Sequence, residues 1–349
     1  MAARRTRRSE RFLEYISRFE EIAVVSHNNP DPDAISSGWA LKHLIETKLD
    51  RKVKVLAGGA VWRAENLRMI ELLKPPITLV DKWMPDGDVA AILIDCAPTA
   101  NNHLLGEGGI EPAAVIDHHE VDGKRFRVGY RDIRPRVAAL SSIAAEYLRE
   151  QKVEPGARLA TSLMYAINTE TTGWQAVFSP TDRKAISWLN DFYDPAWFSD
   201  IQNAPLTRDY FGDLLLALEK TFIYEDAALC FLPRATGPEI AAEVADLLLR
   251  CKGVERVLCA AVVGEDLLIS ARTSRAGGDA VSLLTKTLKK IGFSGGHRHR
   301  AGGKVPGLET RAKVDEMQTL LRGQWLAACG IQQSRGSRLV ALKEIVTNL

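Results

Sequence analysis

The feature that most constrains the fold is a set of short, nearly continuous apolar runs in the first half of the chain. Runs of strand length fall at 22–25, 53–56, 77–80, 90–94 and 113–116. Apolar runs without strict polar alternation indicate strands covered on both faces, which is typical of a parallel sheet. A helical pattern at 34–49 separates the first two runs. The sequence therefore predicts an α/β fold with a doubly wound, mainly parallel sheet.

The second half of the chain has a different rhythm and predicts a smaller α+β domain. Strands are expected at 227–232, 256–263 and 267–271, helices at 239–250 and 279–291, and a glycine-rich basic loop after the last helix. Prolines between two helical patterns favour a linker. We predict a catalytic domain at 1–195, a linker at 196–212, a second domain at 213–307 and a C-terminal helical extension at 308–349.

Composition excludes several classes of protein. Hydrophobic residues make up 46% and charged residues 26% of the 349 residues, as in ordinary globular proteins. No apolar run is long enough for a membrane span, and a net charge of +2 argues against wrapping a long polyanion. The five cysteines are odd in number and show no Cys-x-x-Cys pair, which favours a reducing compartment. We expect a cytoplasmic protein without a membrane partner, and a homodimer is compatible with the sequence.

Acidic and imidazole side chains follow three of the predicted strands. They are His27, Asp31 and Asp33 after the first, Asp95 after the fourth, and Asp117, His118 and His119 after the fifth. The carboxyl ends of strands in an open α/β sheet meet at one crevice, where ligands bind. We therefore expect these side chains to lie together.

Crowded carboxylates repel one another and resist burial, and divalent cations would relieve both effects. Mixed oxygen and imidazole ligands suit Mn²⁺ first, with Mg²⁺, Fe²⁺ and Zn²⁺ as alternatives. The ligands are too many for one ion, so two cations are expected. Each residue also has a structural interpretation. Taken alone, Asp33 is a good helix N-cap, and a His-His pair is more often a surface feature than a metal site.

Five motifs resemble those of the DHH phosphoesterases and their second, DHHA1-type domain, in the same order and spacing. They are 27–33 (HNNPDPD), 93–95 (LID), 117–119 (DHH), 270–273 (SART) and 295–303 (GGHRHRAGG). The small nanoRNase and phosphoadenosine-phosphate phosphatase branch is similar in size, whereas the RecJ exonucleases are larger.

The resemblance implies a role for each matching residue. His27, Asp31 and Asp95 would hold one metal, and Asp33, Asp95 and His118 the second, so that Asp95 bridges the two ions. Glu170 stands where the family has an Asp that completes the second site. His119 would contact the scissile phosphate, and Asp117 would support the two histidines.

The second domain carries a basic, glycine-rich cluster, predicted to lie in two loops, that resembles a substrate-binding motif. Arginine offers a planar fork that matches phosphate oxygens, and glycines let the backbone approach a ligand closely. The resemblance implies that this cluster grips a terminal phosphate or nucleotide. The predicted substrate-binding residues are Arg272, Arg275, Gly295, Gly296, His297, Arg298, His299 and Arg300.

The function expected from these features is two-metal hydrolysis of short RNA or of a 3′,5′-bisphosphonucleoside. A linear or cyclic dinucleotide phosphodiesterase is the main alternative within the same chemistry. A processive RecJ-like exonuclease fits less well, because the near-neutral charge argues against a long strand channel. From a different class, the chain could be a nucleotide sensor that binds without cleaving, which the departure at Glu170 motivates. A pyrophosphatase is a third possibility, because one branch of the DHH phosphoesterases has this activity. That branch, however, has a different second domain from the Gly-Gly-His type that this sequence resembles.

Overall fold

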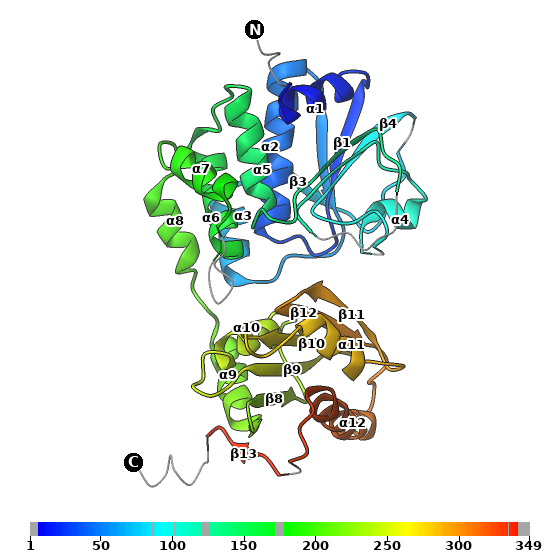
Figure 1. Ribbon diagram of the computed structural model, residues 1–349, viewed down its shortest axis with the longest axis vertical. Coiled ribbons are helices and arrows are strands. Elements are labelled where there is room, and N and C mark those ends of the chain that lie inside the picture. Colours follow the sequence, from blue (N-terminus) through cyan, green and yellow to red (C-terminus); the bar gives the residue numbers. More distant parts are fainter. Residues whose placement is uncertain are drawn as a thin grey trace. The chain divides into compact units, whose positions relative to one another are not determined.

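The computed structural model describes residues 6–85, 87–100, 102–119, 126–171, 178–333 and 335–340. The chain divides into two compact units, residues 1–204 and 205–349 (Figure 1). The division lies within the predicted linker, 196–212, which also contains most of helix α8 (Pro195–Gln202).

The first unit is built on a six-stranded parallel sheet with the order β3-β2-β1-β4-β5-β6. Its strands are β1 (Glu21–Val25), β2 (Val53–Ala57), β3 (Ile77–Leu79), β4 (Val89–Ile94), β5 (Ala114–Asp117) and β6 (Tyr130–Ile133). The chain winds outward from β1 in one direction and from β4 in the other, so strand order reverses between β1 and β4. The predicted α/β class is confirmed, while β6 was not foreseen from the sequence.

Both faces of this sheet are buried, which accounts for the continuous apolar runs. Successive residues of β1 alternate between two cores: Ile22 and Val24 pack on one side, and Ala23 and Val25 on the other. Helix α4 contributes Leu104 to the second core. The helices of this unit besides α8 are α1 (Arg8–Ile16), α2 (Pro32–Leu49), α3 (Ala64–Leu73), α4 (Leu104–Gly108), α5 (Leu140–Glu150), α6 (Gly156–Thr171) and α7 (Pro180–Leu189).

Helix α2 begins directly behind the first predicted site motif. Asp31 is its N-cap, since its carboxylate accepts a hydrogen bond from the Ala34 amide at 3.0 Å, and Pro32 occupies the first helical position. The interpretation of Asp33 as the N-cap is therefore wrong. Asp33 lies inside the first turn, where the positive end of the helix dipole favours a carboxylate.

The second unit contains a seven-stranded mixed sheet with the order β11-β12-β10-β9-β8-β7-β13. Strands β8 and β9 pair in parallel, and the other described pairs are antiparallel. Its strands are β7 (Thr221–Tyr224), β8 (Ala227–Leu232), β9 (Arg256–Val263), β10 (Asp266–Thr273), β11 (Phe293–His297), β12 (Arg300–Val305) and β13 (Ser337–Arg338). The predicted glycine-rich loop is a β-hairpin, β11–β12. Glycine lowers strand propensity, which hid this hairpin from the sequence patterns.

Helices cover both faces of the second sheet. They are α9 (Arg208–Lys220), α10 (Ile240–Leu248), α11 (Ala280–Thr287) and α12 (Arg311–Cys329). Trp325 of α12 is fully buried in one of the two main cores of this unit, so the segment predicted as an extension is part of the packed unit.

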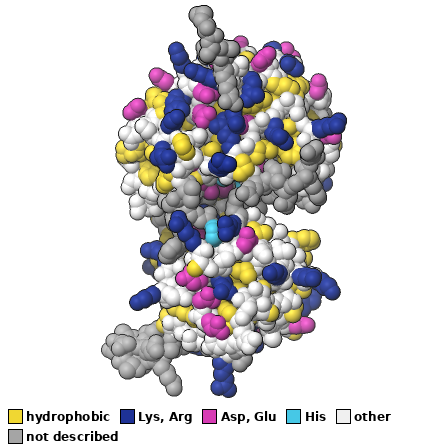
Figure 2. Space-filling model, viewed as in Figure 1, with side chains coloured by type: hydrophobic (Ala, Val, Ile, Leu, Met, Phe, Trp, Pro, Cys, Tyr) yellow, Lys and Arg dark blue, Asp and Glu magenta, His cyan; other side chains and the backbone are white. Residues whose placement is uncertain are grey.

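Charged side chains of both signs are interspersed over the face shown in Figure 2, in keeping with the small net charge. Among the described helices, none combines the length and apolarity that crossing a membrane requires.

Candidate functional site

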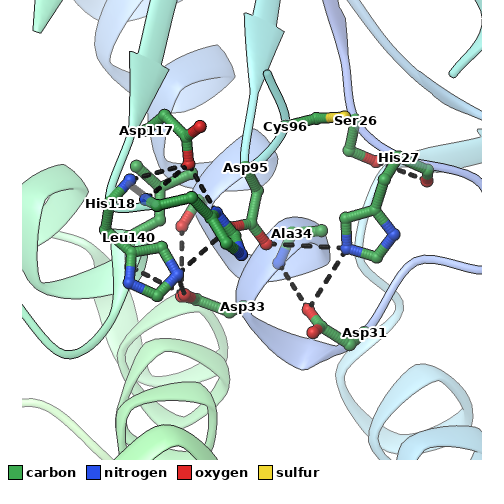
Figure 3. Close-up of polar contacts among 12 residues, drawn as sticks. Ser26, His27, Asp31, Asp33, Ala34, Asp95, Cys96, Asp117, His118 and Leu140 are labelled. Carbon is green, nitrogen blue, oxygen red and sulfur yellow. Dashed lines mark hydrogen bonds and ion pairs between the residues drawn. The ribbon is translucent and has the colours of Figure 1, made fainter. Parts of the chain in front are cut away.

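The acidic and imidazole residues of the first unit meet at the carboxyl edge of its sheet, where strand order reverses. His27 follows β1, Asp95 follows β4, and His118 follows β5. Figure 3 shows Asp95 between the side chains of His27 and Asp31 on one side and that of His118 on the other. Ligands of open α/β sheets bind at this topological position.

Asp95 is the residue that joins the two sides of the site. Its Oδ2 lies 3.6 Å from His27 Nε2, and its Oδ1 lies 3.3 Å from His118 Nε2 and 3.6 Å from His119 Nδ1. Asp95 has a φ of 56°, which is uncommon for a residue other than glycine and stores strain at the end of β4. The positive φ turns the chain immediately after the strand, and the buried carboxylate lies at the sheet edge.

Two backbone carbonyls orient the imidazoles toward these carboxylates. His27 Nδ1 donates to the Asn28 carbonyl at 3.0 Å, and His118 Nδ1 donates to the Val137 carbonyl at 3.2 Å. In both residues Nε2 is therefore the nitrogen nearest the carboxylates. Metal-binding histidines have the same arrangement, in which a hydrogen bond at one ring nitrogen directs the other toward the ion.

Asp33 is held by helix α5. Its two carboxylate oxygens accept hydrogen bonds from the Leu140 and Ser141 amides, each at 2.6 Å, and Oδ2 lies 3.7 Å from His118 Nε2. The side chain thus binds amides of the first turn of α5 and also faces His118. No sequence pattern marks these two amides, which lie more than 100 residues further along the chain.

Asp117 supports the two histidines as the resemblance implied. Its Oδ1 accepts hydrogen bonds from the His118 amide at 2.7 Å, from the His119 amide at 3.1 Å and from His119 Nδ1 at 2.7 Å. The side chain is completely buried. It fixes the turn after β5 and the orientation of the His119 ring.

The electrostatics show how strongly these groups depend on one another. Burial opposes the charged form of His27, but Asp95 and Asp31 raise its pKa to about 10. Burial likewise opposes the charge of Asp95, yet the imidazoles of His118 and His27 hold its pKa well below the usual range. Burial, together with the neighbouring Asp95, raises the pKa of Asp33 to about 7. The site therefore carries a density of negative charge that requires nearby positive charge.

The donor set fits divalent cations. Two groups of potential ligand atoms lie within 4.8 Å of one another, and both include Asp95. One group is His27, Asp31 and Asp95, and the other is Asp95, His118 and His119. Asp95 Oδ1 is buried and accepts no hydrogen bond within the described part of the chain. A buried carboxylate oxygen without a donor is costly, and a metal ion would satisfy it.

Glu170 lies near the end of α6 and is half-buried. Burial opposes the charged form of His118, but Asp95, then Asp33 and then Glu170 raise its pKa above the usual value, so the Glu170 carboxylate acts on this imidazole. Glu170 belongs to neither group of clustered ligand atoms, and Asp33 does not either.

The predicted substrate-binding residues of the second unit occupy strands as well as loops. Arg272 lies on β10 and Arg300 on β12, directly opposite each other in the register, and both line a cavity of about 280 Å³. The placement of Arg272 and Arg300 in loops was therefore wrong. Ala241 and Ala242 of helix α10, together with Pro238 just before the helix, line another side of this cavity, which no sequence motif indicated.

Arg272 is buried and fixed by its neighbours. Its Nε donates to Asp246 Oδ1 at 2.5 Å, and one terminal nitrogen donates to Ser270 Oγ at 2.6 Å. The guanidinium is thus held rigidly at the cavity, which reduces the entropy lost on binding an anion.

Among the described side chains and glycines of the cluster, the remaining members do not line this cavity. Arg275 and Arg298 are exposed in turns, and His299 contacts Thr273 Oγ1 through Nδ1 at 3.0 Å. Gly295, Gly296 and His297 belong to β11, and the side chain of His297 is outside the described atoms.

Comparisons with known proteins agree with this architecture. Residues 21–167 match the sequence model of the DHH family, N-terminal domain. An exopolyphosphatase-related protein from Bacteroides fragilis has a similar structure, with a TM-score of 0.69, 16% identity, and coverage of 92% of this chain and 97% of that one. At this sequence identity, the similarity to the Bacteroides fragilis protein shows a shared fold.

A relative in Methanocaldococcus jannaschii, an uncharacterized protein, is 30% identical over 286 residues, or 82% of this chain. The chain spans 58% of the length of that protein. Residues 21–167, which contain the parallel sheet and the acidic and imidazole residues of the site, thus match the N-terminal domain of the DHH family.

Proposed function

We propose that this protein is a two-metal phosphohydrolase that cleaves short oligoribonucleotides or 3′,5′-bisphosphonucleosides. The observation that carries the proposal is the position of Asp95, which is shared by two adjacent groups of ligand atoms. Two ions bridged by one carboxylate are the usual arrangement for in-line displacement at phosphorus.

In this proposal His27, Asp31 and Asp95 hold the first ion. Asp95 and His118 hold the second, together with Asp33 and Glu170. The ions, with Mn²⁺ preferred by the mixed oxygen and nitrogen donors, would activate a water molecule and offset charge on the phosphoryl group. The carbonyls of Asn28 and Val137 keep Nε2 of the two histidines oriented as ligands.

His119 is the residue proposed to contact the substrate phosphate. Its Nδ1 is bound to Asp117, so a contact with a phosphoryl oxygen would fall to Nε2. The carboxylate of Asp117 raises the pKa of His119 against the effect of burial. A protonated ring would stabilise negative charge that develops on the phosphoryl oxygens.

The cavity at Arg272 and Arg300 is proposed to bind a second phosphate of the substrate. Two cross-strand guanidinium groups match the charge and the planar geometry of phosphate oxygens. Such a site would favour substrates that carry a terminal phosphate over unphosphorylated ones.

The proposal is tested with purified protein and Mn²⁺ on 5′-phosphorylated diribonucleotides, 3′,5′-bisphosphoadenosine, a long single-stranded RNA and inorganic polyphosphate. Turnover of either of the first two, with slower cleavage of the long strand, supports it. Comparing the cleavage rates of the diribonucleotide and of a cyclic dinucleotide distinguishes this function from that of a dinucleotide phosphodiesterase, the main alternative. The proposal fails if metal binds and neither of the first two substrates is cleaved.

A nucleotide sensor is the second candidate, because Glu170 replaces the usual Asp and lies outside both groups of clustered ligand atoms. The variant Glu170→Asp distinguishes the two. If the natural protein binds metal and nucleotide without turnover, and Glu170→Asp creates turnover, the sensor function is correct.

A further inference from the structure

One edge of the second sheet presents an open surface next to the Arg272 cavity. The edge strand β11 pairs with β12, and β12 pairs with β10, all antiparallel. Residues paired directly across antiparallel strands project from the same face of a sheet. The register therefore defines three rows on the face that bears Arg272. From one end to the other, the first row contains Phe293, Lys304 and Leu268. The second row contains Gly295, Gly302 and Ser270, and the third contains Arg300 and Arg272.

In the middle row β11 and β12 contribute no side chains, Ser270 of β10 being the one residue of this row that has a side chain, and the fold does not require two glycines there. A Cβ atom added to Gly295 or Gly302 would meet no atom within 4 Å, and neither residue has a positive φ. The neighbouring glycines differ. Gly296 has a φ of +130°, and a Cβ there would lie 2.4 Å from the Arg300 carbonyl oxygen. Gly296 is needed for the hairpin, whereas Gly295 and Gly302 leave a flat strip of exposed backbone.

The first row contributes an aromatic ring. Phe293 is 76% exposed, more than any other large hydrophobic residue in the described chain. It stands at the start of β11, beside Lys304 and next to the glycine strip. The exposed Phe293 ring stands beside the flat backbone of Gly295 and Gly302. A planar ligand ring can stack on the phenylalanine and lie against this backbone.

The third row and the cavity behind it are cationic. Residues two positions apart on a strand are separated by about 7 Å, so the arginine row lies about 7 Å from the glycine strip. The surface thus changes from aromatic to bare to cationic over a short distance. A nucleoside monophosphate has the same order of groups, with a base at one end and a phosphate at the other.

We propose that Phe293 and the Gly295–Gly302 strip form a nucleobase platform for the nucleotide whose phosphate binds at Arg272 and Arg300. This inference rests on the proposed function, since it assigns a second contact to the same substrate. Stacking accepts every base because each has a π-face. The platform therefore selects nucleotides as a class and disfavours phosphate chains without a base, such as inorganic polyphosphate.

The test uses two ligands that differ only in the base, adenosine 5′-monophosphate and ribose 5-phosphate. Binding of each to the full-length, metal-free protein is measured by isothermal titration calorimetry. Stacking on an aromatic residue contributes about 1–3 kcal/mol, so the monophosphate should bind about 5- to 140-fold more tightly. Phe293→Ala should weaken adenosine 5′-monophosphate by about that factor and leave ribose 5-phosphate unchanged.

Three further variants serve as controls. Phe293→Tyr should restore the base preference. Phe211→Ala removes another exposed phenylalanine, on α9, and should change neither ligand. Gly295→Ala should keep the circular dichroism spectrum and melting temperature of the natural protein, and should weaken only the ligand with a base.

Equal affinity for the two ligands, an equal effect of Phe293→Ala on both, or no binding of adenosine 5′-monophosphate would overturn the platform. Because binding is measured without turnover, these outcomes are separate from the hydrolysis test. A protein that cleaves diribonucleotides without base preference would keep the proposed function and lose the platform. A protein that binds adenosine 5′-monophosphate through Phe293 but cleaves none of the substrates would keep the platform and lose the proposed function.

Discussion

Replacing Asp95 by asparagine should abolish most of the stabilisation that Mn²⁺ gives to the first unit. Asparagine has nearly the same shape as aspartate but no charge, and Asp95 belongs to both groups of ligand atoms. Loss of an outer hydrogen-bond partner of a metal ligand already weakens metal binding about 10- to 100-fold. Loss of a shared ligand should therefore weaken binding by at least about 100-fold.

The size of the effect follows from mass action. At a Mn²⁺ concentration of 100 times the dissociation constant, the natural protein gains about 2.7 kcal/mol of stability. For a unit of this size, that corresponds to a rise in melting temperature of roughly 5–10 °C. At the same concentration, a 100-fold weaker variant gains about 0.4 kcal/mol, or roughly 1 °C.

Differential scanning calorimetry with and without Mn²⁺ measures this difference directly. The matched control is Asp81→Asn, because Asp81 is exposed and follows β3 as Asp95 follows β4. Asp81→Asn should keep the full rise in melting temperature. If Asp95→Asn also keeps it, while the metal-free variant is folded by circular dichroism, then Asp95 does not join two metal sites.

Three other predictions test separate parts of the structure. Metal binding should strengthen as pH rises from 6 to 8, because carboxylates raise the pKa of His27 to about 10 and an ion must displace its proton. Calorimetry in buffers of different ionisation enthalpy should detect this proton release. A metal affinity that does not change with pH would contradict the prediction. Asp132→Asn should lower the free energy of unfolding by about 3 kcal/mol in urea titrations, because the buried carboxylate pairs with Arg134 and accepts from Tyr147. Arg134 holds the pKa of Asp132 below its usual value despite burial. The stabilisation from this carboxylate is therefore present at neutral pH and is lost as pH falls through the folded-state pKa of Asp132. On acidification, Asp132→Asn should lose less stability than the natural protein. Gly296→Ala should destabilise the second unit by roughly 1–3 kcal/mol, and equal melting of Gly295→Ala and Gly296→Ala would show that the positive φ is not needed.

The sequence predicted the parallel sheet and the gathering of acidic and imidazole groups because both follow from local patterns. Apolar runs at 22–25 and 90–94 indicated strands buried on both faces, and the residues directly after them had to lie at one edge of the sheet. His27, Asp95 and His118 meet there for this reason.

Other parts of the site depend on contacts between distant segments. The amides of Leu140 and Ser141 that bind Asp33, and the Val137 carbonyl that orients His118, belong to backbone that any residue type could supply. No sequence pattern marks such groups, because every residue except proline carries the same donor and acceptor.

The second unit shows the same division between what the sequence determined and what only the tertiary structure decided. The arginines and glycines of 270–303 indicated phosphate binding through their residue types alone. The pairing register of β11, β12 and β10 then decided which of them share a face, placing Arg272 opposite Arg300 and Gly295 opposite Gly302. A shift of one residue in this register would move each side chain to the other face of the sheet. Residue types fix the chemistry that is available, and the register fixes which groups can act on the same ligand.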